Sequence, residues 1–199
     1  MFGRQKILTE ERKKALQEFR KQAINALEEL GNNAKDDFEG NIYLSMIDSI
    51  KQTPLKFYPA RSLRGNFYRI AGTVFGSVVK GENVKQIRII QQGNRFFIQS
   101  IAHINLPAEH VFEGSRLTVE GIFTLCHEYA HFPKPGVRAF ALHNNLSLEQ
   151  AEELLADVLA AKLAKKLGYS RQTILEQLSG REIVFGSVPF KKMVLRALQ

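Results

Sequence analysis

The chain contains 199 residues, 44% of them hydrophobic, which is enough to form one well-buried domain. Its single cysteine excludes a disulfide framework within the chain and is typical of a reducing compartment. The net charge is +8, and no apolar run approaches the length of a membrane span or follows the first residues as in a secretory signal. We therefore expect a soluble, cytoplasmic protein that does not enter the membrane.

The predicted elements are helices on either side of a group of strands. Helical patterns with start and stop signals precede and follow a group of period-2 strand patterns, which are separated by short turns containing Gly and Asn. This order predicts an α+β fold with a small, mainly antiparallel sheet. We assign residues 1–53 to a helical N-terminal arm and residues 54–199 to the main domain. In chain order we expect helices at 9–30 and 36–50, strands at 66–79, 84–91 and 95–106, and helices at 118–131, 147–167 and 170–178.

The strand region carries most of the positive charge. Residues 51–106 contain nine basic side chains and one acidic side chain, and residues 56–69 interleave the cations with aromatics. This composition suits contacts with phosphates and stacked bases, or with an acidic protein surface. A solvated sheet face with its aromatics in the core has the same composition. Nucleic acid or an acidic protein is therefore a candidate partner for residues 51–106.

The helix expected at residues 118–131 contains the segment His127-Glu128-Tyr129-Ala130-His131. Residues four apart lie on one face of a helix, so both imidazoles can reach a single metal ion. Glu128 can take a proton from a metal-bound water. The opposite face carries Cys126, Tyr129 and other apolar residues, so the helix is expected to pack against the core through that side. This pattern predicts a hydrolytic zinc site.

The next helix offers the missing ligand. Catalytic zinc sites normally use three protein ligands and leave a fourth position for water. Ser147 and Gln150 form a capping box at the start of this helix, and Glu149, Glu153 and Asp157 share one stripe with alanines. Small side chains let two helices approach closely, which a carboxylate needs if it is to reach a metal on the neighbouring helix.

Together these segments resemble the gluzincin metallopeptidases. The resemblance rests on His127-Glu-x-x-His131 followed by Glu153-x-x-Ala-Asp157, and it is closest to small soluble members of the ImmA/IrrE and SprT kinds. It implies a zincin-like core, Zn²⁺ as the cofactor, and hydrolysis of a peptide or protein substrate. It also implies that His127, His131 and Glu153 bind the metal, that Glu128 is the catalytic base, and that Asp157 orients a ligand imidazole. The strand before the metal helix, near residues 101–106, would be the edge to which an extended substrate adds.

Other zinc enzymes match less well, and one further histidine is a candidate for the site. A metzincin would need a third histidine at position 137, which is Val, and Cys126 points toward the core rather than toward the metal. We read His143 as part of a loop, where it is either a substrate or oxyanion contact or a solvated side chain. The alternative function is a basic nucleic-acid-binding protein whose zinc site is structural or inactive.

Overall fold

In a computed structural model, the protein is described at residues 7–58, 82–92, 95–131, 137–178, 194–196 and 198. Over residues 82–92 and 95–103, and at residues 105 and 139, the description covers the backbone alone. The helices are α1 (Glu10–Asn32), α2 (Asp37–Gln52), α4 (Ala108–Val111), α5 (Val119–Ala130), α6 (Val137–Asn144), α7 (Leu148–Lys166) and α8 (Arg171–Leu178). The strands are β1 (Leu55–Tyr58), β2 (Glu82–Gln92), β3 (Arg95–Pro107), β4 (Phe112–Glu113) and β5 (Arg116–Leu117). The predicted α+β class is confirmed, and the strand predicted at residues 66–79 lies outside the described residues.

The helices of the expected metal site begin where the sequence predicts, because side chains cap their first turns. Thr118 accepts a hydrogen bond from the backbone N–H of Gly121 at the start of α5. Ser147 and Gln150 form the predicted capping box at the start of α7. At the other end of α7, Gly168 adopts a φ of 94°, a conformation that favours glycine. Both helices of the expected metal site therefore begin at locally specified positions, and α7 also ends at one.

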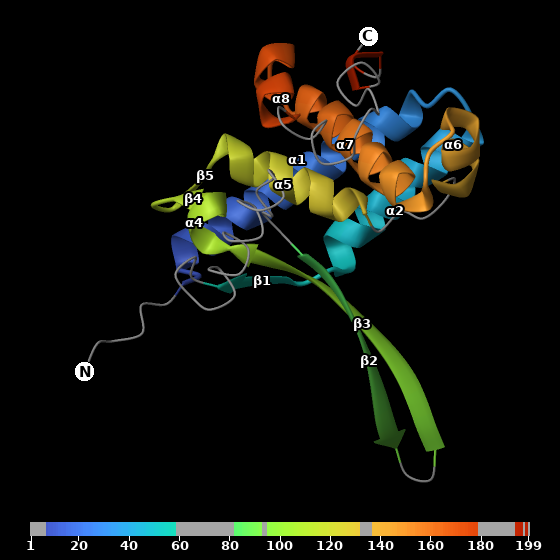
Figure 1. Ribbon diagram of the computed structural model, residues 1–199. Helices are drawn as coiled ribbons and strands as arrows, with labels where there is room; N and C mark the ends of the chain where they lie inside the picture. Colours follow the sequence, from blue (N-terminus) through green and yellow to red (C-terminus); the bar gives the residue numbers. More distant parts are fainter. Residues whose placement is uncertain are drawn as a thin grey trace.

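The four longest helices, α1, α2, α5 and α7, lie together and share one hydrophobic core (Figure 1). The two N-terminal helices contribute buried side chains to the same cluster as the helices of the expected metal site. The division between an arm at 1–53 and a domain at 54–199 stays a prediction. The core includes Phe19 and Leu27 of α1, Tyr43 and Met46 of α2, Leu106 of β3, Leu125 and Tyr129 of α5, and Leu159 and Leu163 of α7.

The larger sheet has the strand order β1-β3-β2, so β3 is its central strand. β2 and β3 form an antiparallel hairpin, and β1 runs parallel to β3 with Leu55 opposite Ile104 and Tyr58 opposite Pro107. This arrangement corrects the prediction of an edge at residues 101–106 in part, because residues 101–103 pair with β2 alone among the described residues whereas Ile104 and Asn105 pair on both sides. At Ile104 both sides of β3 are already hydrogen-bonded, with β1 on one side and β2 on the other. A substrate strand cannot add there without displacing one of them.

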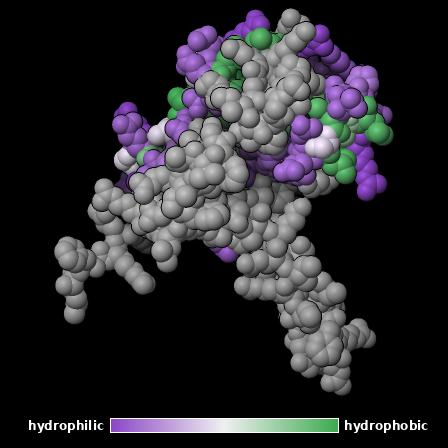
Figure 2. Space-filling model, in the orientation of Figure 1, coloured by the Kyte–Doolittle hydropathy of each residue, from purple (hydrophilic) through white to green (hydrophobic). Residues whose placement is uncertain are grey.

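The outer surface of the helical part is mainly hydrophilic in the view of Figure 2, where apolar side chains appear in small, separate groups. Among the residues whose side chains are described, the exposed large apolar ones are Phe38, Leu44, Val119, Leu142 and Leu148. Among the described residues, no helix combines the length and the apolar character needed to cross a bilayer.

An ion pair joins α2 to α7 on the side of α7 away from the metal residues. Nζ of Lys162 lies 2.6 Å from Oε1 of Glu39, and the Tyr43 hydroxyl donates a hydrogen bond of 2.9 Å to the same oxygen. Burial raises the pKa of the Glu39 carboxyl, but hydrogen bonds from Lys162, from the backbone of Lys35 and from Tyr43 outweigh it. They lower this pKa from 4.5 to about 2.

We expect Lys162→Met to lower the free energy of unfolding by about 1–3 kcal/mol near pH 7, because it leaves a mostly buried carboxylate without its cation. Since the Glu39 pKa is lower in the folded state, its contribution is complete above about pH 4.5 and disappears as the pH falls toward 2. Urea unfolding at a series of pH values measures both effects.

The matched control is Lys166→Met, also in α7. Its ion pair with Glu29 is 2.6 Å long, but the two side chains are 37% and 61% exposed. This control should cost less than about 1 kcal/mol and show little dependence on pH. Equal losses in the two variants would contradict a special role for the α2–α7 ion pair.

Candidate metal centre

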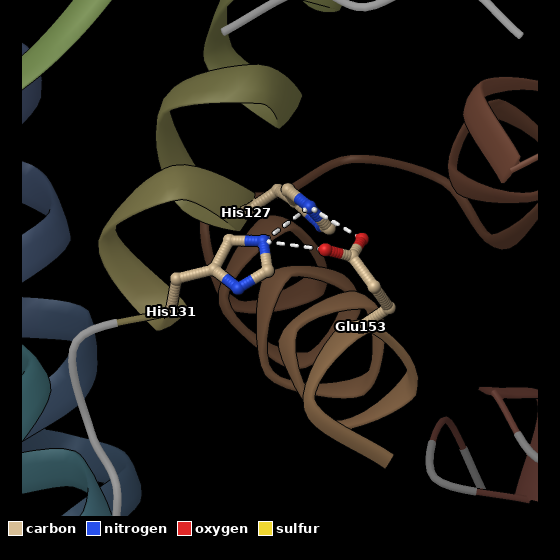
Figure 3. Close-up of side chains that lie close together, drawn as sticks. All are labelled: His127, His131 and Glu153. Atoms are coloured by element: carbon tan, nitrogen blue, oxygen red, sulfur yellow. Dashed lines mark hydrogen bonds and ion pairs between the residues drawn. The ribbon is translucent and has the colours of Figure 1, made fainter. Parts of the chain in front are cut away.

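Helix α5 brings His127 and His131 to one face, one turn apart (Figure 3). Their Nε2 atoms face each other at 2.9 Å, and the ring centroids are 4.6 Å apart with the planes nearly perpendicular. Both side chains are largely enclosed, at 10% and 13% exposed. His131 is the C-cap residue of the helix, so the pair lies at its C-terminal end.

Helix α7 supplies the third group, Glu153, whose carboxylate points at both imidazoles (Figure 3). Its Oε1 lies 3.3 Å from Nε2 of His131, and its Oε2 lies 3.5 Å from Nε2 of His127. The helices approach closely enough for this contact because α7 faces the core with small residues. Ala156 and Ala160, on the predicted stripe, are 1% and 0% exposed.

The three side chains form a group that could hold a metal ion, and their spacing is compatible with zinc. Each offers one ligand atom, and these atoms all lie within 4.8 Å of one another. A tetrahedral zinc ion with ligands at about 2.0–2.2 Å has neighbouring ligand atoms roughly 3.3–3.6 Å apart. The distances of 2.9, 3.3 and 3.5 Å match this geometry to within roughly half an ångström. Two neutral imidazoles and a carboxylate are ligands that zinc commonly takes in catalytic sites.

Asp157 lies where the resemblance to gluzincins implies, behind His127. Its Oδ1 is 2.8 Å from Nδ1 of His127, and the side chain is only 1% exposed. A carboxylate at this distance favours a proton on Nδ1, which leaves the Nε2 lone pair of a neutral imidazole directed at the other two ligands. The contact suits the tautomer of His127 that a metal ion would need.

Glu152 is a residue that the sequence analysis missed. Its Oε1 lies 3.7 Å from Nδ1 of His131, so each imidazole has a carboxylate near the nitrogen that faces away from the ligand group. The two contacts differ, because Glu152 is 34% exposed and lies beyond hydrogen-bond distance. No sequence pattern identifies it, since successive residues on a helix point about 100° apart and Glu152 lies off the stripe of Glu153 and Asp157.

We expect Asp157→Asn to weaken zinc binding by ~10–100-fold, because Asn no longer provides a charged acceptor for the imidazole proton. Glu152→Gln is the matched change at the other histidine, and its longer, more exposed contact predicts a smaller loss. Competition titration against a chromophoric zinc chelator measures both affinities. If Asp157→Asn bound zinc as tightly as the unmodified protein, Asp157 would have no part in orienting His127.

Glu128 and His143, the other two predicted site residues, have different positions. Glu128 follows His127 in the sequence of α5 and is 8% exposed, so the candidate base is a buried carboxylate next in the chain to a candidate ligand. His143 does not lie in a loop, as we had predicted, but in the last turn of α6. It is exposed and does not belong to the group of three ligands. The helix was missed because its start follows Pro135 and Gly136, which read as a continuing loop.

The back of α5 anchors the metal helix in the core, as the sequence predicts for Cys126 and Tyr129. Both residues are completely buried, and burial raises the pKa of the Cys126 thiol, so this cysteine remains protonated. The Tyr129 hydroxyl accepts hydrogen bonds of 3.2 and 3.1 Å from the guanidinium of Arg20 on α1. The same guanidinium donates to the backbone carbonyl of Thr53. The N-terminal helix therefore supports the segment that carries both histidines.

Comparisons with protein-family models, with curated proteins and with solved structures find no match to this chain. The resemblance to gluzincins thus depends on the spacing of the motif residues and on the grouping of His127, His131 and Glu153.

Proposed function

We propose that this protein is a zinc-dependent metallopeptidase of the gluzincin type, with a zincin-like core around α5 and α7. The observation that carries the proposal is the convergence of His127, His131 and Glu153 from two helices. The contact of Asp157 with the rear nitrogen of His127 supports it further, because such contacts accompany ligand histidines in zinc sites.

In this proposal the residues of the chain have distinct tasks. His127, His131 and Glu153 would hold the zinc ion, and Asp157 keeps His127 in the correct tautomer. When bound, zinc lowers the pKa of a water toward ~7 and polarises a scissile carbonyl. Glu128 accepts a proton as the water attacks the carbonyl carbon, and then returns it to the leaving amine. A buried carboxylate suits this role, because its environment excludes bulk water that would compete for the proton.

A structural zinc site, as in the alternative function, fits the residues less well. Structural sites are closed by four protein ligands, whereas catalytic sites use three and keep a fourth position open. Among the described residues, the group that can hold one ion consists of three side chains. Glu153 is also 25% exposed, so the ligand group is open to solvent on the α7 side. Both features favour the catalytic interpretation.

Removal and return of the metal test this proposal. We expect protein treated with a chelator to stop cleaving a mixed peptide library, with products read by mass spectrometry, and about one equivalent of zinc to restore cleavage. Magnesium should not restore it, because two imidazoles and one carboxylate are poor ligands for magnesium. Cleavage that survives complete removal of zinc would contradict the proposal, and so would the absence of cleavage by protein that holds one zinc per chain.

A further inference from the structure

The β2–β3 hairpin projects from the helical body, and its far half has no described helix or strand against it in Figure 1. Its pairing runs from Glu82 opposite Asn105 at the base to Gln92 opposite Arg95 near the tip. The base is joined to the body through β1, which pairs with β3 from Ile104 to Pro107. Beyond Ile104, the pairing described for β3 is with β2 alone. A two-stranded hairpin is only marginally stable by itself in water, so a projecting one suggests a partner.

The charge of the hairpin indicates what kind of partner it is. Between residues 84 and 103 the chain has three basic residues, Lys85, Arg88 and Arg95, and no acidic residue. This part of the hairpin belongs to the basic region identified in the sequence, whose nine basic residues and one acidic residue span 51–106. A surface with this charge attracts a polyanion.

The register separates the hairpin into two unlike faces. Directly opposed residues share a face, and successive residues along a strand alternate between faces. One face is mostly apolar and includes Ile104, which is buried at the base of the hairpin. This face is therefore the extension of the side of the sheet that packs against the helical body. We call the other the arginine face, and it carries both arginines and three glutamines. From the base to the tip, its opposed pairs are Glu82 with Asn105, Val84 with His103, Gln86 with Ile101, Arg88 with Gln99, Ile90 with Phe97, and Gln92 with Arg95. The acidic residue of this face, Glu82, thus lies at the base, away from both arginines.

We propose that the arginine face of the β2–β3 hairpin binds double-stranded DNA in the major groove. The major groove is wide enough to admit a two-stranded β-ribbon. The paired part of the ribbon from residue 84 to residue 92 is about 27 Å long, which is shorter than one turn of the duplex. Arginine and glutamine are the residue types that bond guanine and adenine edges, and both also reach phosphates.

Duplex DNA suits this face better than single-stranded nucleic acid or an acidic protein. Binding of single strands relies on aromatic rings that stack on successive bases along one groove. The register places Phe96 and Phe97 on opposite faces of the hairpin, so they do not form such a series. Three glutamines lie beside two arginines on this face. Glutamine offers both a donor and an acceptor, as the edge of a base pair does, whereas the carboxylates of an acidic protein surface only accept hydrogen bonds.

Fluorescence anisotropy with a labelled 24-base-pair duplex tests the inference on the full-length protein. We expect micromolar binding at low salt that weakens steeply as salt is added. The double substitution Arg88→Gln, Arg95→Gln should weaken it by roughly 10-fold or more and flatten the salt dependence. The control is Lys14→Gln, Lys21→Gln, which removes the same charge from exposed positions of α1 and should weaken binding by less than about 2-fold.

The inference would be overturned by no binding of the duplex, by equal losses in the two double variants, or by displacement of the duplex by poly-glutamate of the same charge at equal concentration. The last result would identify an acidic protein surface as the partner, and tighter binding of single strands would likewise reject the major groove. Circular dichroism of each variant establishes that it is folded. Because zinc takes no part in this measurement, its outcome leaves the proposed peptidase activity to be tested separately.

Discussion

Replacing Glu128 with glutamine is expected to leave zinc bound and to reduce peptide hydrolysis by at least ~100-fold. Glutamine has nearly the same size and shape as glutamate, so the buried position next to His127 should remain filled. An amide cannot accept the proton of the attacking water, and general acid–base catalysis by one group typically contributes ~10²–10⁴-fold to a rate. The measurement is the rate of cleavage together with the zinc content of the same sample.

Glu149→Gln is a suitable control, because Glu149 is an exposed carboxylate one turn before Glu153 on α7. It makes the same change of charge and should leave hydrolysis within about 2-fold of the unmodified rate. If Glu128→Gln cleaved peptides as fast as this control, Glu128 would not be the base. If it lost zinc as well as activity, the loss of activity would report on the metal and not on the proton transfer.

Replacing Gly121 with alanine is expected to destabilise the fold by about 2 kcal/mol or more. A Cβ atom at this position of α5 would lie 2.5 Å from the carbonyl oxygen and 2.6 Å from the Cα of Val111. Those atoms belong to the backbone of α4 and cannot turn aside as a side chain would, so the two helices must separate. Because α5 carries both histidines, we expect the variant also to bind zinc more weakly. Urea unfolding and zinc titration measure the two effects.

Gly40→Ala is the matched change in a helix that has room for it. The nearest atom to a Cβ at position 40 of α2 is the Cβ of Ala34 at 3.8 Å, which is an ordinary contact. Alanine has the higher helix propensity, so this variant should gain about 0.5–1 kcal/mol. A gain of the same size in Gly121→Ala would contradict the close approach of α5 to Val111.

The parts of this structure that depend on local signals could be predicted from the sequence. Thr118 and Ser147 start the two helices of the site, and Gly168 ends the second. Once both helices were predicted, helical geometry alone put His127 beside His131. The pairing of Glu153 with them required the alanine stripe on α7 and a family resemblance, because spacing within one helix does not specify the neighbour.

The parts that depend on contacts between distant residues could not be predicted. Arg20 and Tyr129 are 109 positions apart, and Glu39 and Lys162 are 123 apart, so no periodicity relates them. Strand β1 has four residues, which is too short for a reliable alternation pattern, and its pairing makes β3 central rather than an edge. Likewise, position 121 requires glycine because the backbone of Val111, on another element, leaves no room for a Cβ atom there.

The most direct test of the central claim is the zinc content of the purified protein, measured by elemental analysis beside Glu153→Ala and the control Glu149→Ala. We expect about one zinc per chain in the unmodified protein and in the control, and little in Glu153→Ala, because two imidazoles alone hold zinc weakly. Equal zinc in Glu153→Ala would remove Glu153 from the site. An unmodified protein that neither contains zinc nor takes it up when zinc is added would contradict the metal centre itself, and with it the proposed peptidase.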